Sequence, residues 1–322
     1  MIEKQIVTVE DTAAVAVVDN NPFKAATFKA WIDFCDVQPA TQKTYNKAVE
    51  NFAAYLRDNG IELPTREDVI AYREHLLSNG YKVSSARLYM TVVKNFFRFL
   101  SSKAIYPNVA DGVKLPAMPS DEHARDALTL DESKAAINSF KGTDEKSLRD
   151  KCILCLMIGA GLRSVEICRL DVGDIEKRRG QWFIRVHGKA RAGKTDSVQI
   201  SAELKKVVDD YLSVRKNVKK GTPLFVSTAN RCRGCRLETQ TVSRLAKKVF
   251  ASIGIESERV TCHSCRHACA SLMLQAGVPM RQVSKIMRHR SVVTTEIYAH
   301  DIDAFNNHGV QTLSKILFSS KE

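Results

Sequence analysis

Five side chains that could handle a phosphodiester lie close together near the end of the chain: His263, Arg266, His267, His289 and Tyr298. A guanidinium can neutralise phosphoryl oxygens, an imidazole can move a proton, and a phenol oxygen can act as a nucleophile. Because a free phenol has a pKa of about 10, Tyr298 needs cationic neighbours to react near neutral pH. This stretch therefore predicts a site that binds and attacks a phosphodiester.

Helices are expected to position these groups. Thr261 is the expected N-cap of a helix that ends at Gly277, and the residues between them carry Ala, Leu and Met at helical spacing. On this helix His263 and Arg266 lie three residues apart, so they share one face.

Shorter helices are expected to follow. Pro279 fits the first turn of one helix, and Ser291 is placed to cap another that carries Tyr298. Residues 303–317 form a further amphipathic candidate. Its apolar stripe needs a partner surface, so we expect it to dock on a neighbouring protomer.

An arginine far upstream is a second candidate phosphate ligand. Arg163 follows the turn Gly159-Ala160-Gly161, and Glu166 is expected to orient it rather than to act as an acid or base. A glycine-punctuated hairpin is expected next, between strands at 181–186 and 197–200. Seven cations between Lys177 and Lys194, with no carboxylate in that span, favour binding to a nucleic-acid backbone.

Composition narrows the class of protein. The chain has 322 residues, is 44% hydrophobic and carries a net charge of +13, with a pI near 9.3. The length suits about two domains, and the charge suits a polyanion such as nucleic acid. No apolar run reaches the roughly 18 residues of a membrane span, and the N-terminus lacks the pattern of a signal peptide. Nine cysteines without a secretion signal indicate reduced thiols in the cytoplasm.

The N-terminal half is expected to be a helical domain. Residues 1–21 lack a helical period and predict a flexible arm, whereas residues 22–106 predict four helices with inward apolar stripes. These helices run over residues 23–34 and then begin at Thr41, at Thr65 and at Ser84 or Ser85. The basic residues expected beside the stripes, as candidates for DNA phosphates, are Lys43, Lys47, Arg87 and Lys94.

A second domain is expected after a linker. Residues 107–127 contain three prolines and no periodicity, which predicts an interdomain linker that lets two domains clasp a duplex. Residues 128–322 form the second domain, which opens with the capping sequence at 129–132. Its other expected helices cover residues 148–158, 162–170, 203–218 and 241–253.

Five short motifs resemble the boxes of the tyrosine recombinases, the integrase family, in the family's order. They are G-L-R-S-V-E-I-C-R-L at 161–170, G-K at 188–189, H-S-C-R-H at 263–267, M-R-H at 287–289 and E-I-Y-A-H at 296–300. Each motif alone is weak, but five in order are specific, and the resemblance covers residues 23–318. It implies a mainly α fold, with an N-terminal four-helix, SAM-like core-binding domain and a mixed α+β catalytic domain containing a small antiparallel sheet.

The resemblance also implies a role for each residue. Arg163 and Arg266 would clamp the scissile phosphate and His289 would bond it. His263 would act in proton transfer, and Lys189 would donate a proton to the leaving 5′ oxygen.

Tyr298 would attack the phosphate, leaving a 3′-phosphotyrosine link and a free 5′ hydroxyl. Exchanging one phosphodiester for another is close to energy-neutral, so no nucleotide cofactor is implied. No metal is implied either, since guanidiniums and a lysine supply the electrostatics. The expected partners are double-stranded DNA, three further copies of the chain in a tetramer on two sites, and accessory DNA-bending or directionality proteins. The expected location is cytoplasmic and nucleoid-associated.

Two departures from the family pattern bear on the site. The family commonly has Leu-Gly before the histidine, where this chain has Met287-Arg288, and the arginine could clash or add a phosphate contact. The hairpin loop also offers two lysines. Lys189 fits the Gly-Lys position, but Lys194 is the acid if the register differs, and Arg191 and Lys194 are otherwise candidates for binding DNA.

The biological role divides into alternatives. Integration or excision of a mobile element is the main interpretation, and Xer-type resolution of chromosome or plasmid dimers is the alternative. A rival from another class is a zinc-stabilised DNA-binding regulator that cuts nothing. It would use the pairs Cys232/Cys235 and Cys262/Cys265, whose spacing can bind zinc.

Overall fold

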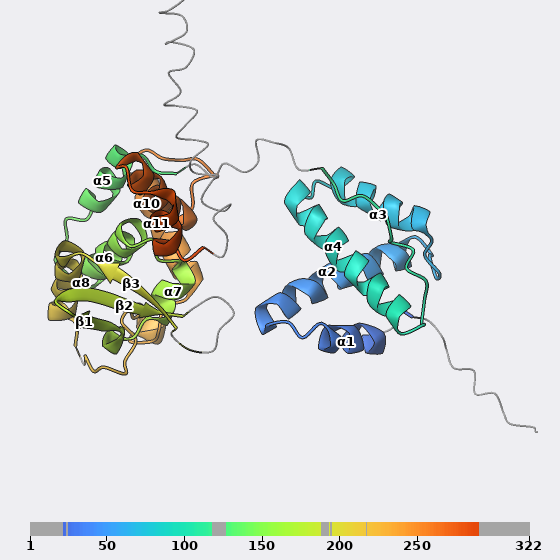
Figure 1. Ribbon diagram of the computed structural model, residues 1–322, viewed down its shortest axis with the longest axis horizontal. Helices are drawn as coiled ribbons and strands as arrows, with labels where there is room; N and C mark the ends of the chain where they lie inside the picture. Colours follow the sequence, from blue (N-terminus) through green and yellow to red (C-terminus); the bar gives the residue numbers. More distant parts are fainter. Residues whose placement is uncertain are drawn as a thin grey trace, which may run out of the picture. The chain divides into compact units, whose positions relative to one another are not determined.

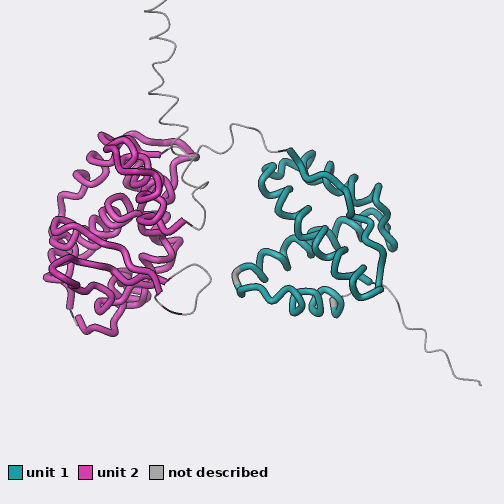
Figure 2. The backbone as a smooth tube through the Cα atoms, viewed as in Figure 1, with its two compact units in different colours: residues 1–122 teal, residues 123–322 magenta. Residues whose placement is uncertain are grey.

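The computed structural model describes residues 22–23, 25–117, 127–187, 193, 195–216 and 218–289. The chain divides into two compact units, residues 1–122 and 123–322, which are coloured separately in Figure 2. The fold is mainly helical with one small sheet, as Figure 1 shows, and this confirms the predicted fold class. No helix within the described ranges combines the length and the apolar character that crossing a membrane requires.

The described part of unit 1 contains four helices around an aromatic core. They are α1 (Ala25–Phe34), α2 (Pro39–Asp58), α3 (Arg66–Ser78) and α4 (Val83–Ser102). Trp31, Phe52, Tyr72 and Phe96 are fully buried between them. Thr65 caps α3 as predicted, but Thr41 was wrong as the start of α2. The N-cap of that helix is Gln38, three residues before the predicted cap Thr41, because Pro39, with its fixed φ, occupies the first turn.

The chain that leaves α4 packs back onto unit 1. Ala110 and Val113, within the segment predicted to be a linker, are buried in the core of this unit. Basic side chains of α3 and α4 donate hydrogen bonds to backbone carbonyls of this segment. The donor and acceptor pairs are Arg66 to Asp111, Arg73 to Lys114, Arg87 to Pro116 and Lys94 to Val113. Residues 109–117 are therefore held on the surface of unit 1.

Unit 2 builds its helices around a long buried one, α6. Its helices are α5 (Leu130–Asn138), α6 (Glu145–Gly159), α7 (Ser164–Arg169), α8 (Ala202–Val214), α9 (Thr239–Ser252), α10 (Cys262–Gln275) and α11 (Met280–Ile286). Seven consecutive residues of α6, 152–158, are buried, so neighbouring elements cover it on every side. Two short 3₁₀ turns, Val172–Asp174 and Asn230–Cys232, complete the helical elements among the described residues.

The sheet has three antiparallel strands in sequence order: β1 (Ile175–Arg178), β2 (Gln181–Val186) and β3 (Asp196–Ile200). Both strands expected from the sequence are present. The first strand, β1, was missed because it has only four residues, Ile-Glu-Lys-Arg, with no apolar alternation. It joins β2 through Arg179 and Gly180, whose φ angles of 47° and 81° fit a type I′ hairpin turn.

Several predictions lie outside the described residues. These are the N-terminal arm 1–21, the helix expected after Ser291 and the amphipathic segment 303–317. The hairpin residues Lys189, Arg191 and Lys194, and Tyr298, also lie outside them.

Candidate active site

Arg266 lies inside unit 2 and joins two loops that are distant in sequence. Its helix, α10, begins at the predicted N-cap Thr261, whose side chain accepts a hydrogen bond from the backbone N–H of His263. Arg266 is 5% exposed. Its two terminal nitrogens donate to the backbone carbonyls of Gly161 and Met287. A planar guanidinium can reach two acceptors at once, which a lysine cannot do with the same fixed geometry.

Gly161 allows this close approach. Its φ is +59°, in the left-handed region that favours glycine. A Cβ added there would lie 2.7 Å from the Met287 sulfur and 3.3 Å from the Cys269 sulfur. The turn before α7, the end of α11 and the middle of α10 therefore meet at a position without room for a side chain.

Arg163 follows this turn and is oriented by Glu166, as the sequence predicted. The Glu166 carboxylate accepts from the backbone N–H of Arg163 and from its Nη1, both at 2.8 Å. The Glu166 side chain is 4% exposed, whereas that of Arg163 is 26% exposed. Glu166 therefore fixes one edge of the guanidinium from inside, and part of the Arg163 side chain stays open to solvent.

The C-terminal end of α11 determines where His289 lies. The backbone N–H of Arg288 donates to Lys285 at 3.0 Å, and that of His289 donates to Ser284 at 3.0 Å. Arg288 has a φ of 54°. This is a Schellman motif, in which a left-handed residue closes the helix and reverses the chain. His289 is thus placed by backbone geometry at the first position after the reversal.

Cations surround His289. Burial lowers its pKa, and Arg266, Arg163, Arg288 and His267 lower it further, to about 4. His289 is therefore neutral near pH 7, where its ring N–H can donate a hydrogen bond to a phosphate oxygen without adding charge. Arg266 bonds the carbonyls of Gly161 and Met287, which lie two residues before Arg163 and His289, so the structure brings together three of the six predicted catalytic residues.

The departure at Arg288 has a specific outcome. Neither alternative drawn from the sequence describes it, because the side chain turns inward and is 8% exposed. Its Nη2 donates to Glu166 Oε2 at 2.7 Å, and its Nη1 donates to the Ile286 carbonyl at 3.0 Å. Sequence reasoning missed this pairing, although the unusual arginine at a glycine position marked the residue.

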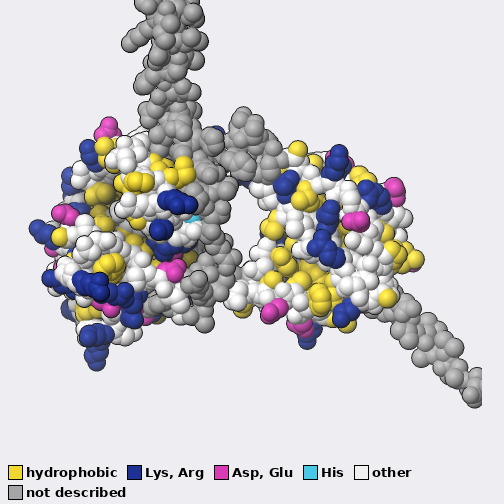
Figure 3. Space-filling model, in the orientation of Figure 1, with side chains coloured by type: hydrophobic (Ala, Val, Ile, Leu, Met, Phe, Trp, Pro, Cys, Tyr) yellow, Lys and Arg dark blue, Asp and Glu magenta, His cyan; other side chains and the backbone are white. Residues whose placement is uncertain are grey.

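Two histidines near Arg266 differ in exposure. His263 is exposed at the first turn of α10, with Nδ1 3.8 Å from the Cys262 sulfur, and His267 is half-buried. Figure 3 shows Lys and Arg side chains on the drawn face of unit 2, with histidine atoms visible beside some of them. Lys189, Lys194 and Tyr298 lie outside the described residues, so their roles stay predictions.

The predicted basic run is partly neutralised by carboxylates that precede it. Arg178 pairs with Glu176, which lies two residues earlier on the same strand. Arg185 Nη2 lies 3.4 Å from Asp174 Oδ1, and Arg185 Nε lies 3.8 Å from Glu176 Oε1. Two of the seven cations therefore have carboxylate partners within unit 2, and binding of this run to a nucleic-acid backbone stays a prediction. The antiparallel register brings Arg185 near Glu176, whereas Arg178 and Glu176 lie on the same strand.

The four predicted DNA contacts of unit 1 fall into two kinds. Lys43 and Lys47 are exposed on α2. Arg87 and Lys94 are half-buried on α4 and donate to the carbonyls of Pro116 and Val113. The first pair is open to a phosphate, and the second pair has a structural role in this unit.

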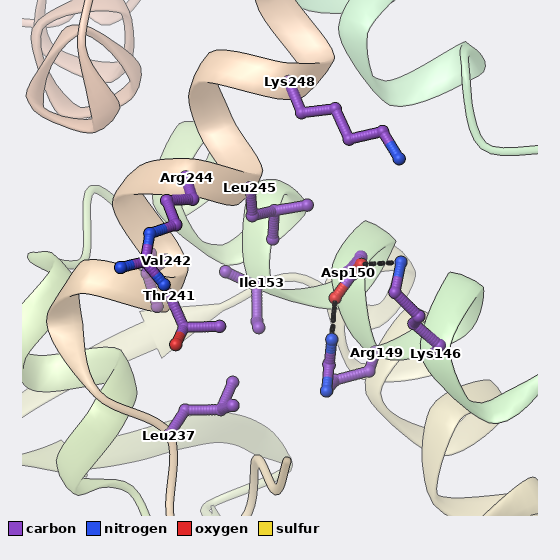
Figure 4. A pocket seen from close by; sticks show the side chains of 10 residues that line it. All are labelled: Lys146, Arg149, Asp150, Ile153, Leu237, Thr241, Val242, Arg244, Leu245 and Lys248. Atoms are coloured by element: carbon purple, nitrogen blue, oxygen red, sulfur yellow. Dashed lines mark hydrogen bonds and ion pairs between the residues drawn. The ribbon is translucent and has the colours of Figure 1, made fainter. Parts of the chain in front are cut away.

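A separate pocket of unit 2 lies between α6 and α9, with a volume of about 260 Å³ (Figure 4). Ile153, Val242 and Leu245 are among its apolar lining residues. Arg149 and Lys146 both pair with Asp150 at its edge, as the dashed lines mark. None of the predicted catalytic residues lines it, so the pocket does not belong to the candidate active site.

The cysteines give the zinc alternative no site within the described ranges. No group of three or more His, Cys, Asp or Glu side chains is arranged there to hold a metal ion. Cys232 and Cys235 are exposed in a loop, whereas Cys262 and Cys265 are buried on α10. Burial raises the pKa of the Cys265 thiol well above its usual range, which opposes the thiolate form that zinc requires.

Comparison with known proteins supports one family. Residues 127–304 match the phage integrase family, and residues 34–104 match the SAM-like N-terminal domain of phage integrases. Tyrosine recombinase XerA of Pyrococcus horikoshii is 32% identical over 237 residues, covering 73% of this chain and 75% of that protein. Tyrosine recombinase XerC of Vibrio cholerae is 29% identical over 273 residues, covering 81% and 82%.

Solved structures share the fold. A XerH site-specific recombinase bound to palindromic difH substrate in a post-cleavage complex has a TM-score of 0.71 at 16% identity, covering 91% of this chain and 85% of that one. A lambda integrase (75–356) dimer bound to a COC′ core site has a TM-score of 0.62 at 19% identity, covering 83% and 96%. With these matches along both units, the chain belongs to the phage integrase family and is a site-specific recombinase of the tyrosine class.

Proposed function

We propose that this recombinase cuts and rejoins double-stranded DNA through a 3′-phosphotyrosine intermediate formed by Tyr298. The observation that carries the proposal is the convergence of Arg163, Arg266 and His289 around the end of α11. Two guanidiniums and a neutral imidazole can stabilise the charge that develops on a phosphoryl group under attack. DNA in the complexes of XerH and lambda integrase supports DNA as the partner.

Each residue has a distinct role in the proposed reaction. Arg163 and Arg266 bind the non-bridging oxygens, and His289 hydrogen-bonds one of them. His263, at the exposed start of α10, accepts the proton that the Tyr298 hydroxyl loses as it attacks. Tyr298 forms the bond to phosphorus, and the 5′ oxygen leaves with a proton from the hairpin lysine, Lys189.

The experiment is covalent capture. The purified chain is denatured after incubation with DNA, and the DNA that stays attached to protein is recovered and sequenced. Tyr298→Phe should retain DNA binding and lose capture, whereas the control Tyr45→Phe should retain both. Capture that persists in Tyr298→Phe would move the nucleophile to another residue, and no capture by the unaltered chain would refute the reaction.

We also propose that both units contact one duplex and that four protomers act on two sites. The exposed lysines of α2 are the contacts of unit 1, and segment 303–317 docks on a neighbouring protomer. A chain that ends at residue 302 should bind one site but assemble without cooperativity, as measured by sedimentation with DNA. Cooperative assembly of the shortened chain would refute the docking.

The biological role has two candidates. Integration and excision of a mobile element is the main one, with accessory DNA-bending or directionality proteins and a nucleoid location. Xer-type resolution of chromosome or plasmid dimers is the second, and similarity to the recombinases named XerA and XerC supports an Xer-type enzyme. The captured DNA separates them, because element ends would indicate the first role and one chromosomal or plasmid site the second.

A further inference from the structure

The left-handed position at the end of α11 holds an arginine, and that of α4 holds Ala104, whereas four other described helices place a glycine there. In α2, α3, α9 and α10 the residue that closes the helix with positive φ is a glycine: Gly60, Gly80, Gly254 and Gly277. Arg288 occupies the same backbone position with a φ of 54°. A side chain with a Cβ is disfavoured there, and the Arg288 side chain makes an interaction that can offset the backbone strain.

The interaction is a buried contact of two guanidiniums with one carboxylate. Glu166 accepts from Arg163 through both oxygens and from Arg288 through Oε2 at 2.7 Å. The side chains of Glu166 and Arg288 are 4% and 8% exposed, whereas that of Arg163 is 26% exposed. Arg288 donates through Nη1 and Nη2, and its Nε is buried with no hydrogen-bond partner among the described residues.

The second arginine changes the net charge of the group around Glu166. With Arg163 as the sole cation on Glu166, the two charges would cancel, and an anion approaching Arg163 would meet a neutral pair. With Arg288 present, the same carboxylate faces two cations and the group keeps one positive charge. Because Arg288 is the more buried of the two arginines, the residual charge is available on the side of Arg163.

We propose that Arg288 is a positioning residue of the recombination reaction: it serves as the counter-ion of Glu166 and so leaves the charge of Arg163 available to the DNA phosphate. The proposal deepens the function proposed above and rests on it. Arg288 acts through Glu166 and touches no reacting atom. Glycine at this position would relieve the backbone but would leave Glu166 to neutralise Arg163.

The first test uses Arg288→Gly, which favours folding because glycine suits the left-handed backbone. We expect it to melt no lower than the unaltered chain and to bind the captured DNA sequence with similar affinity. Its rate of covalent capture should fall about 10- to 100-fold, by analogy with the loss seen when the outer partners that orient metal ligands are removed. Arg288→Lys, which keeps the charge, should recover part of the rate. Ala104→Gly, at the left-handed end of α4, is the matched control and should leave capture unchanged.

A second substitution distinguishes electrostatics from packing. Glu166→Gln removes the negative charge but keeps an oxygen that can accept from Arg163. If Arg288 serves to neutralise Glu166, the double variant Glu166→Gln with Arg288→Gly should capture DNA faster than Arg288→Gly alone. If the two losses instead multiply, or if Arg288→Gly captures DNA at the normal rate, the proposal is overturned.

A third readout needs no DNA and separates this proposal from the proposed function. The pKa of His289 depends on the charges around it. The cationic groups that lower it are Arg266 and His267 of α10, Arg163 before α7 and Arg288. Glu166 pairs with Arg163 and Arg288. By NMR titration, Arg288→Gly should raise the pKa of His289, and adding Glu166→Gln should lower it again. An unchanged pKa overturns the inference, whereas failure of the unaltered chain to capture DNA overturns the proposed reaction.

Discussion

The guanidinium of Arg266 donates to the carbonyl of Gly161, a residue 105 positions earlier in the chain. A second bond, to the carbonyl of Met287, ties the same side chain to the end of α11. One buried arginine thus fixes the turn that leads to Arg163 and the turn that leads to His289. Because both turns bond the same side chain, a shift of Arg266 would move both Arg163 and His289, the two candidate phosphate ligands.

Gly161→Ala should disturb this arrangement more than an equivalent change elsewhere. The new Cβ would lie 2.7 Å from the Met287 sulfur at a backbone φ of +59°. We expect a loss of about 2–4 kcal/mol in the free energy of unfolding, from overpacking and backbone strain together. The control Gly254→Ala has a φ of +82° and no atom within 4 Å, so it should lose about 1 kcal/mol. Equal losses in denaturant titrations would show that close packing at Gly161 contributes nothing.

The stability of the chain should fall on acidification through His289. Its folded pKa is about 4, below the ordinary value of 6.5, so the unfolded chain binds more protons between these two values. The free energy of unfolding should therefore decrease as the pH falls from about 6.5 to 4. After allowance for solvent screening, we expect this to amount to about 1–3 kcal/mol.

Denaturant titrations at several pH values measure this effect. His289→Gln should remove this part of the pH dependence, whereas substitution of the exposed His75 by Gln should leave it in place. A His289→Gln chain with an unaltered pH profile would contradict the assignment.

Changing the leaving group of the DNA can identify which hairpin lysine donates the proton. If Lys189 donates a proton to the 5′ oxygen, Lys189→Ala should reduce cleavage of ordinary DNA by about 10²- to 10⁴-fold. In a DNA substrate with sulfur in place of that bridging oxygen, the leaving group departs as a thiolate and needs no proton. Lys189→Ala should therefore cleave this substrate nearly as fast as the unaltered chain does. Lys194→Ala is the matched control. If the sulfur-containing substrate restores cleavage to Lys194→Ala and not to Lys189→Ala, the proton donor is Lys194.

The basic residues of unit 1 should separate into two groups by experiment. Lys43→Ala and Lys47→Ala should each reduce the salt dependence of DNA binding by about one unit of slope without changing thermal stability. Arg87→Ala and Lys94→Ala should lose about 1–3 kcal/mol of stability, because each donates to a backbone carbonyl of residues 113–116. If all four variants behave alike in both measurements, the division is wrong.

Local signals predicted much of the fold. Thr65, Thr129 and Thr261 each cap a helix where the sequence placed a start, because a side-chain oxygen followed three residues later by a polar partner is a local feature. The five motifs likewise identified the family. The polar strand β1 and the start of α2 were missed, since both depend on a turn or a proline rather than on periodicity.

Pairings between distant segments could not be predicted. The contact of Arg288 with Glu166 joins residues 122 positions apart, whose proximity depends on the complete fold. The bonds of Arg87 and Lys94 to the segment after α4 are of the same kind. A basic residue in a sequence shows its charge, whereas its partner is determined by tertiary packing.

The Schellman motif that ends α11 has a consequence for the length of that helix. One inserted residue in α11 would advance its end by about 1.5 Å and rotate it by about 100°. His289 follows that end directly, so it would swing away from Arg266, while Arg163 would stay where α7 and Glu166 hold it. We therefore expect this seven-residue helix to tolerate many changes of residue type on its exposed face but no change in the number of its residues.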